Sequence, residues 1–489
     1  MKSHYFKVDI TIVAIIFMGA LYILFPSSNN TTDSLAYASE MRDGINLFRP
    51  HHLLYNALGY VLIHITGVTK PLPFMCFINA VFAIGCLLVM RLILMPFTGE
   101  KVRAAIIVLL GASFGFMRFS IDNEAYIVPL FFSLLASWVL LAKKNVLLAG
   151  FFAATACLFH QIHFFWWLGL LIFIIQAFGS TRRKSMGQYM LMALIVPAVY
   201  LLVFMLTRND CNTIFEFVFH DYVKYDDVSL TFKPVTLLLA PINLFRTFFQ
   251  VHGYFLPLLQ RFGYLWIGVL LAVFFLLLGV FSLKNAIKKK NPDFYDNKFA
   301  IAHLYIFFLQ FLFAFLSDGN AEFMVMLPFA FCIFLVIKYE LKKRLVIYIA
   351  LGLFLWNITL GLIPFHFYEL GPEAGMTRYI RAHPDETYLL RDKNWVENLL
   401  FYHHPQQNYH LNNASTLKEN ALDSIVRVNY RVLTDLVNNE AFMSRAKMIS
   451  KFNDAIFEKY KIAPVDSFEY DLGKVRIYSI SILSSPAPP

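Results

Sequence analysis

Long apolar segments recur along the first three quarters of this chain and are separated by short polar stretches. A helix that crosses a bilayer needs about 20 mostly apolar residues, and about eleven segments reach that length here. They are centred near residues 17, 85, 111, 133, 152, 170, 197, 270, 307, 330 and 354. The pattern predicts an all-α polytopic membrane protein.

Basic residues gather in alternate loops between these segments, and such clusters mark the cytoplasmic side of a membrane. They are Lys2 and Lys7; Lys101 and Arg103; Lys143 and Lys144; Arg182, Arg183 and Lys184; Lys284, Lys288, Lys289 and Lys290; and Lys342, Lys343 and Arg344. We therefore expect a cytoplasmic N-terminus. An odd number of spans then places the C-terminus on the outer side.

The apolar pattern ends near Pro364, after which charged and apolar positions alternate without a further span. Period-2 and helical patterns predict two strands and two helices there. They cover Thr387–Leu390, Trp395–His403, Asp423–Asn438 and Lys474–Ile480. We expect a transmembrane domain over residues 1–364 and a small extracytoplasmic α/β domain over 365–489, with a frayed tail at 484–489.

Two outer loops are too long to be simple hairpins. In the first, residues 27–73, positions 51–66 predict a helix that lies in or dips toward the interface. The second, residues 207–252, mixes charge with aromatics, which suits another interfacial element. Both are expected to wall a cavity that opens at the outer leaflet.

The composition agrees with this reading. The chain is 58% hydrophobic and only 15% charged, with a mean hydropathy of +0.58, whereas soluble proteins are about a quarter charged. The net charge of +10 does not indicate nucleic-acid binding, because its basic residues follow the loops and form no continuous stripe. The five cysteines show no metal-binding spacing and imply no pairing.

Asp33 is the first acid after the first apolar segment and is expected at the membrane surface. There it could act as a general base. The alternative is a solvated helix cap, because Thr31-Thr32-Asp33-Ser34 is good capping sequence.

A shorter outer loop, at about residues 119–124, brings together Arg118, Asp122 and Glu124. Acids flanked by apolar spans mark function when they face a cavity, and otherwise meet water at a helix end. Asp122 and Glu124 could also hold a divalent cation through their carboxylate oxygens. This spacing alone leaves the metal question open.

Histidines are further candidates. His160 and His163 are three residues apart on one helical face, and His51 and His52 follow Arg49. Two histidines are too few to define a zinc site, so phosphate binding and interfacial packing remain the alternatives, and Arg49 favours an anion site. Together with Glu322 on another outer loop, these residues place acids, histidines and arginines at one membrane face.

The run from Asp33 to Met41, followed by Gly44 and by Leu53-Leu54-Tyr55, resembles the first outer loop of GT-C fold glycosyltransferases, such as the lipid A aminoarabinose transferase and bacterial protein O-mannosyltransferase-like enzymes. The similarity extends through Arg118 to Asp122, Leu147 to Phe159, Glu322 to Pro328 and the outer C-terminal domain. In this chain Pro50-His51-His52 stands where the family has a lysine before two prolines, and His160 stands near the usual lysine of the fifth span.

The resemblance implies an integral-membrane enzyme that moves a hexose or pentose, with inversion, from a polyprenyl-phosphate donor to a lipid, glycan or protein acceptor on the outer face of a bacterial inner membrane. It implies a general base at Asp33 and a second acid at Asp122, and we expect Asp122 and Glu124, which share a loop, to be catalytic as well. Arg49, His51, His52, Arg118, His160 and His163 are the expected contacts of the donor phosphate, and Tyr37, Tyr55 and Glu322 those of the substrates.

Other functions remain open at this stage. A transporter or flippase of a lipid-linked saccharide would show repeated halves and charges within the spans; here the charges lie at one face and no repeat is visible. A glycan polymerase or ligase of another fold would depend on outer-loop arginines, for which Arg246 and Arg261 are available. A non-catalytic membrane scaffold is the third alternative. The sequence alone does not identify the sugar, the acceptor or a need for metal.

Overall fold

The structure is a computed structural model that describes residues 9–207, 211–219, 233–251, 253–284, 286–414, 419–429, 431–437 and 457–482. The predicted tail at 484–489 and residues 220–232 of the second long outer loop lie outside these ranges. The chain divides into two compact units. The helical unit comprises Met1–Pro26, Glu40–Val251 and Trp266–Leu362, and the sheet unit comprises Ser27–Ser39, His252–Leu265 and Ile363–Pro489.

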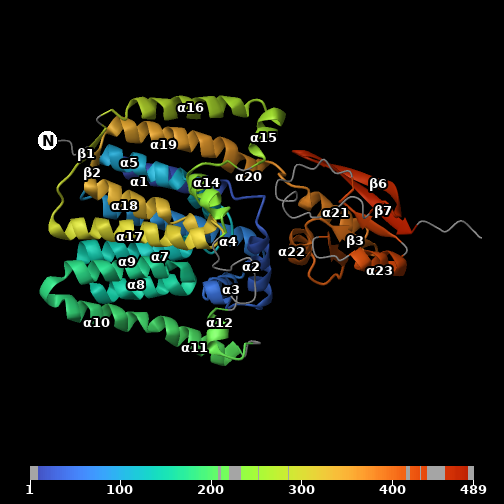
Figure 1. Ribbon diagram of the computed structural model, residues 1–489, viewed down its shortest axis with the longest axis horizontal. Coiled ribbons are helices and arrows are strands. Elements are labelled where there is room, and N and C mark those ends of the chain that lie inside the picture. The colour runs from blue at the N-terminus through green and yellow to red at the C-terminus, as the bar shows by residue number, and fades with distance from the viewer. Residues whose placement is uncertain are drawn as a thin grey trace, which may run out of the picture. The chain divides into compact units, whose positions relative to one another are not determined.

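Long helices dominate the helical unit, and α7, α8 and α9 lie side by side in it (Figure 1). The helices are α1 (Ile10–Leu24), α3 (Tyr55–Thr66), α4 (Pro71–Leu94), α5 (Glu100–Ala112), α6 (Phe114–Ser120), α7 (Ile127–Trp138), α8 (Val146–Phe159), α9 (Phe164–Ala177), α10 (Arg182–Ala193), α11 (Ile195–Thr207), α12 (Ile214–Val218), α14 (Thr236–Phe248), α16 (Leu265–Phe281), α17 (Phe294–Leu316), α18 (Leu327–Lys338) and α19 (Lys343–Asn357). Helix α2 (Thr32–Asp43) begins in the sheet unit and ends in the helical unit.

Short elements complete the helical unit. They are the 3-10 turns η1 (Pro50–His52), η3 (Gln161–His163), η4 (Gly179–Thr181) and η6 (Glu322–Met324), the π-helical segments η2 (Val139–Lys143) and η7 (Ile358–Leu362), and the strands β1 (Ile287–Lys289) and β2 (Tyr339–Leu341). Helix α3 ends at Gly67, whose φ of 68° is the left-handed conformation that glycine adopts without strain.

Each of the eleven predicted centres falls inside a helix. In the described part of the chain, four helices are long and apolar enough to cross a membrane, or five if the bent pair α5–α6 is one span. Shorter apolar helices cover Ile10–Leu24, Ile127–Lys143, Val146–Phe159, Gln161–Ala177, Thr236–Phe248 and Leu265–Phe281. The count of about eleven spans stays a prediction. The helix predicted over residues 51–66 of the first outer loop corresponds to the turn η1 followed by α3.

The sheet unit is α/β. Its elements are α15 (Phe255–Arg261), α20 (Ile363–Phe367), α21 (Glu373–Ala382), α22 (Lys393–His403), α23 (Glu419–Asn429), β3 (Thr387–Leu390), β4 (His410–Asn413), β5 (Val432–Thr434), β6 (Tyr460–Tyr470) and β7 (Gly473–Ile482). The strand order is β4-β3-β5-β7-β6. Strand β3 pairs in parallel with β4 and β5, and β7 pairs antiparallel with β5 and β6.

Three of the four predicted C-terminal elements are present as β3, α22 and β7. The predicted helix over Asp423–Asn438 is wrong in its second half, because α23 ends at Asn429 and Val432–Thr434 forms strand β5. The three residues of β5 are buried, and their pairing with both β3 and β7 outweighs the helical pattern of the preceding turns.

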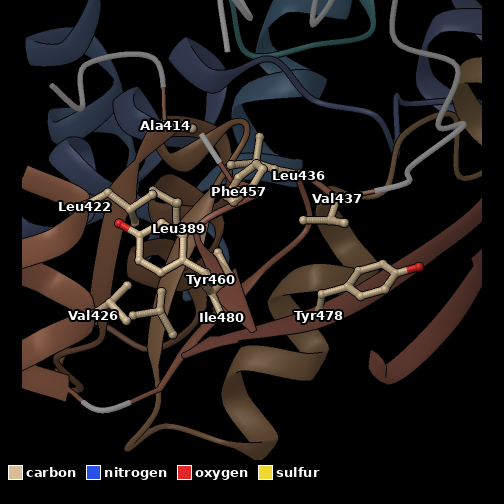
Figure 2. Close-up of a cluster of buried hydrophobic side chains, with 11 residues drawn as sticks. Leu389, Ala414, Leu422, Val426, Leu436, Val437, Phe457, Tyr460, Tyr478 and Ile480 are labelled. Atoms are coloured by element: carbon tan, nitrogen blue, oxygen red, sulfur yellow. The ribbon is translucent and has the colours of Figure 1, made fainter. Parts of the chain in front are cut away.

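The sheet unit has a hydrophobic core on each face of its sheet. On one face α21 and α22 bring Met376, Ile380, Val396 and Leu400 against Tyr388, Leu390, Leu433 and Ile477. On the other face α23 packs through Leu422 and Val426 against Leu389, Val432 and Ile480 (Figure 2). Successive residues of β3 therefore point to opposite cores, as the two-residue period of a strand requires.

Candidate functional site

The first outer loop is organised around the buried carboxylate of Glu40. It accepts hydrogen bonds from Arg49 Nε at 2.9 Å and Arg49 Nη2 at 2.5 Å. Asn46 Nδ2 donates to it at 3.0 Å and Asn56 Nδ2 at 2.7 Å. Glu40 is 6% exposed, and a carboxylate buried to this degree requires such donors. Helix α2, turn η1 and helix α3 are thus joined at one acid.

Three of the predicted histidines come together beside this acid. The ring centroids of His51 and His52 are 4.1 Å apart, and that of His160 lies 6.0 Å from His51 and 6.1 Å from His52. His52 and His160 are almost fully buried. We call these three residues the histidine group. It joins turns η1 and η3, which are more than 100 residues apart in sequence.

Hydrogen bonds between the two turns hold the histidine group together. Gln161 Nε2 donates to the Pro50 carbonyl at 3.1 Å and to Tyr200 Oη at 3.0 Å. The Leu54 N–H donates to the Leu158 carbonyl at 3.1 Å. The pairing of His51 and His52 with His160 therefore follows from backbone contacts as well as ring packing.

Tyr126 connects the histidine group to Glu322, the acid predicted on another loop. Its ring centroid lies 5.2 Å from that of His160, and its hydroxyl donates to Glu322 Oε2 at 2.9 Å. Phe323, next to Glu322, lies 6.3 Å from His160. Glu322 and the histidine group therefore belong to one cluster.

A buried ion pair lies where α6 leads into the loop before α7. Arg118 Nη1 lies 2.7 Å from Asp122 Oδ2, and their side chains are 9% and 0% exposed. The helix preceding this loop breaks at Ser113, so that α6 is bent by 68° from α5. The bend turns the chain before the loop, and Asp122, two residues after the end of α6, meets the guanidinium of Arg118 on the last turn of that helix.

Amides link this ion pair to the first loop. Asn79 Nδ2 donates to the Asp122 and Glu124 carbonyls at 2.7 and 2.8 Å and to Tyr55 Oη at 3.1 Å. Tyr55 Oη donates to Asn123 Oδ1 at 2.8 Å. Predicted residues Tyr55, Asp122 and Glu124 are therefore neighbours, and Glu124 is 3% exposed.

His163 has a different environment. Its Nδ1 lies 2.7 Å from Ser133 Oγ on α7, and its side chain is 1% exposed. The three-residue spacing from His160 suggested a shared role, but turn η3 ends at His163 and α9 begins at the next residue. The two side chains consequently have different partners.

Asp33 and Tyr37 lie in the sheet unit, on the first turns of α2. The Asp33 side chain is exposed, and Tyr37 is 4% exposed. The segment just before Asp33 is held by Asn29, whose Nδ2 donates to the carbonyls of Phe365 and Tyr368 at 3.0 and 2.7 Å. Asn398 Nδ2 on α22 also donates to the Thr32 carbonyl at 3.1 Å.

Several residues of these clusters were not predicted as site residues from the sequence. They are Glu40, Asn46, Asn56, Asn79, Asn123, Tyr126, Gln161 and Tyr200. A signal was available for Asn79, because an amide in the middle of an apolar span is rarely tolerated without a buried partner. Glu40 and Tyr200 lie within helices α2 and α11, and the others lie in loops or near helix ends, where polar residues are ordinary.

The charges in this cluster are largely compensated. Arg49 pairs with Glu40, and Arg118 pairs with Asp122. Burial holds the pKa of His52 well below its usual value, and His51, His160 and Arg49 lower it further. His52 is therefore uncharged at neutral pH. In the described part of the chain, no group of three or more His, Cys, Asp or Glu side chains is arranged to hold a metal ion.

No family model matches the sequence, and no curated protein is similar to it. Solved structures are similar in fold. ArnT from Cupriavidus metallidurans bound to undecaprenyl phosphate superposes with a TM-score of 0.56 at 11% identity, over 98% of each chain. Its apo form gives 0.43 at 11% identity, over 96% of this chain and 97% of that one. The Archaeoglobus fulgidus oligosaccharyltransferase, in complex with zinc and sulfate, gives 0.42 at 14%, over 87% and 68%. The chain thus has the GT-C fold expected from the resemblance.

Proposed function

We propose that this chain is a membrane glycosyltransferase that moves a sugar from a polyprenyl-phosphate donor to a lipid, glycan or protein acceptor. Support comes from the shared fold with ArnT, which was solved with undecaprenyl phosphate, over 98% of both chains. A lipid donor also suits a chain with this many apolar helices. By this proposal the reaction takes place at the outer face of a bacterial inner membrane, with the sheet unit outside.

The observation that carries the proposal is the cluster of titratable groups built from separate loops of the helical unit. The histidine group, Tyr126 and Glu322, and the Arg118–Asp122 pair come from four different loops. Burying so many polar groups together costs stability. Proteins retain such an arrangement mainly where function requires it. A non-catalytic scaffold has no need for this arrangement.

We assign binding of the donor phosphate to Arg49, Arg118 and the histidine group. His163 would contribute indirectly, by holding the turn that carries His160. Both arginines already pair with acids, so their charge is offset before a donor binds. Additional positive charge for a phosphate would come from a histidine that takes up a proton. Arginine and histidine here take the place that lysine has in the resembling enzymes.

We assign general-base catalysis to Asp33. The acceptor hydroxyl attacks the anomeric carbon, its proton passes to the Asp33 carboxylate, and the bond between the anomeric carbon and the phosphate oxygen breaks. The lipid phosphate leaves with the bonding electrons, and the configuration inverts. An exposed carboxylate is accessible to an acceptor. Asp122 and Glu124 are buried and would act by positioning the neighbouring loops, and Tyr37, Tyr55 and Glu322 by shaping the substrate site.

The test of the base is Asp33→Asn, measured as sugar transfer by the purified protein in nanodiscs. The donor is identified first, from the glycolipids that accumulate in a deletion strain. General-base assistance is worth about 10²–10⁴ in rate, and we expect a loss of that size with unchanged expression. Asp43→Asn is the matched control, because Asp43 lies on the same helix and pairs only locally with Arg42. Substantial turnover by the Asp33 variant would refute the assignment.

The test of the phosphate contacts is His160→Gln, measured as binding of undecaprenyl phosphate by native mass spectrometry. Loss of one hydrogen bond to a charged group weakens binding by about ten-fold or more. The control is His64→Gln, since His64 lies on the surface of α3 and bonds only to the Tyr60 carbonyl of its own helix. Equal affinity in the His160 and His64 variants would exclude the histidine group from phosphate binding.

A further inference from the structure

A second polar cluster lies within the sheet unit, at the carboxyl ends of the parallel strands. Arg391 and Asp392 follow β3 directly, and Asp435 follows β5. The Arg391 N–H donates to Asp435 Oδ1 at 2.9 Å, which joins the two strand ends. Asp392 caps α22 by accepting a hydrogen bond from the Trp395 N–H at 3.3 Å.

The topology makes this edge the place where α/β sheets in general bind their ligands. Strand β3 lies between β4 and β5. The chain therefore runs from β3 to β4 on one side of it and then crosses to β5 on the other side. Helix α22, which follows β3, packs on one face of the sheet, while Leu436 and Val437, which follow β5, pack on the opposite face. Chains leaving adjacent parallel strands toward opposite faces open a crevice between them, and ligands of α/β sheets bind there.

Two further elements bring side chains to the same edge. Strand β7 is antiparallel to β5, with Tyr478 opposite Thr434, so the β6–β7 turn at Tyr470–Gly473 extends past the carboxyl end of β5. Helix α21 begins at Glu373, whose carboxyl group lies against Gly371, where it occupies the space that a Cβ would need. The carboxyl group of Glu373 interacts electrostatically with Asp392 and Asp435, and Tyr470 with Glu373 and Arg391.

Two donors in this cluster are buried without a partner among the described residues. Tyr470 is 7% exposed, and its hydroxyl has no hydrogen-bond partner among the described residues. Arg391 Nε is likewise buried without one in the part of the chain that the structure describes. An unpaired buried donor costs about 1–3 kcal/mol. Both donors interact with the same group of carboxylates and point to a ligand that accepts their hydrogen bonds.

The chemistry of the cluster limits the ligand. Three carboxyl groups disfavour a phosphate, and the described residues offer no arrangement for a metal ion. Charged walls disfavour an apolar molecule. A ligand that donates to carboxylates and accepts from arginine and tyrosine is one with several neighbouring hydroxyl groups. Burial together with Asp392 and Asp435 raises the pKa of Glu373 to about 7, so this side chain can donate as well as accept.

We propose that the carboxyl edge of β3 and β5, with Glu373, Arg391, Asp392, Asp435 and Tyr470, binds a saccharide unit. The choice of a saccharide among polyhydroxylated molecules rests on the proposed glycosyltransferase function. Its residues are not among those to which we assign the donor phosphate. A saccharide held there belongs to the acceptor.

Saturation-transfer NMR on the intact protein in nanodiscs tests this proposal, with D-mannose, D-galactose, D-glucosamine and L-arabinose as probes and glycerol as the reference polyol. We expect a signal from at least one sugar and none from glycerol. Tyr470→Phe should weaken the affinity about five-fold and Arg391→Gln about ten-fold or more, the sizes expected for a neutral and a charged hydrogen bond. Tyr409→Phe is the control, because its hydroxyl bonds to Gln407 within the same turn.

The outcomes separate this proposal from the transferase assignment. Sugar binding that persists in Asp33→Asn and still falls in Tyr470→Phe supports the site even if transfer is never detected. No signal from any sugar, or equal affinity in wild type and Arg391→Gln, overturns it. Hydrogen exchange of segment 387–400 in each variant shows whether the sheet unit is folded, so that a lost signal is assigned to the site and not to unfolding.

Discussion

The two polar clusters of this protein differ in how their charges are compensated. In the helical unit, Arg118 pairs with Asp122 and Arg49 with Glu40, and Tyr55 Oη both donates and accepts a hydrogen bond. In the sheet unit, Tyr470 Oη and Arg391 Nε are buried without partners among the described residues. The first cluster joins its loops through completed pairs, whereas the second keeps two buried donors without partners among the described residues.

This difference has measurable consequences for stability. Removing one member of a completed pair leaves its partner buried and uncompensated, which is costly. Removing a donor that has no partner leaves nothing behind and costs little. Substitutions in the helical unit should therefore destabilise more than equivalent substitutions in the sheet unit.

Asp122→Asn should have the largest effect on stability. It removes the carboxylate charge that lies 2.7 Å from the buried guanidinium of Arg118, and breaking a buried ion pair in this way costs about 3–5 kcal/mol. The measurement is the unfolding midpoint in detergent. The control is Asp318→Asn, which removes an ion pair to Lys233 whose side chains are 48% and 34% exposed, and such pairs are worth about 0–1 kcal/mol. Similar losses in both variants would show that burial of the Arg118 pair has no special role.

Glu373→Gln should change how stability depends on pH. The pKa of Glu373 is raised to about 7, from 4.5 in an unfolded chain, so the folded state holds its proton more tightly. The stabilisation is present below pH 4.5 and is lost as pH rises through 7, up to about 3 kcal/mol in all. The glutamine variant should remove this slope. Asp392, Asp435, Arg391 and Tyr470 are the other titratable and charged groups in this cluster, and they remain in the variant.

Hydrogen exchange of segment 387–400 in the intact protein, measured from pH 5 to 8, reads out this stability. Wild-type protection, corrected for the intrinsic exchange rate, should fall across that range, and Glu373→Gln should stay level. A slope that persists in the variant would assign the pH dependence to a different group.

The sequence was sufficient to predict the elements with a clear period. Long apolar runs located the helices, and β3, α22 and β7 were found at or near their observed bounds. Strand β5 was missed because three residues are too few to show an alternation, and its pairing depends on β3 and β7, which are distant in sequence. The switch of β5 to the other side of β3 is likewise invisible to local patterns.

Prediction of the site had a similar limit. Residue type and loop position selected His51, His52 and His160, and the structure brings them together. The acid that pairs with Arg49 was not selected, because Glu40 lies mid-helix among ordinary polar residues. His163 was expected to share the role of His160, but the turn between them gives it Ser133 as a partner. Neighbours of this kind depend on tertiary contacts, which spacing does not encode.

Tyr55→Phe tests the paired cluster with a smaller change. It removes a buried hydroxyl that donates to Asn123 Oδ1 at 2.8 Å and accepts from Asn79 Nδ2 at 3.1 Å. Leaving a buried acceptor unpaired costs about 1–3 kcal/mol. We expect that loss in the unfolding midpoint. No change would mean that the amides of this network re-pair without the hydroxyl.

Tyr470→Phe is the matched change in the other cluster and should have the smallest effect. The hydroxyl that it removes is buried without a partner in the described part of the chain, so the free energy of unfolding should change by less than about 0.5 kcal/mol or rise. A saccharide at ten times its Kd should stabilise the wild-type sheet unit by about 1.4 kcal/mol, and the variant by less, because its affinity is lower. A loss above about 1 kcal/mol without sugar would instead show that this hydroxyl serves the fold, and the two clusters would then be alike.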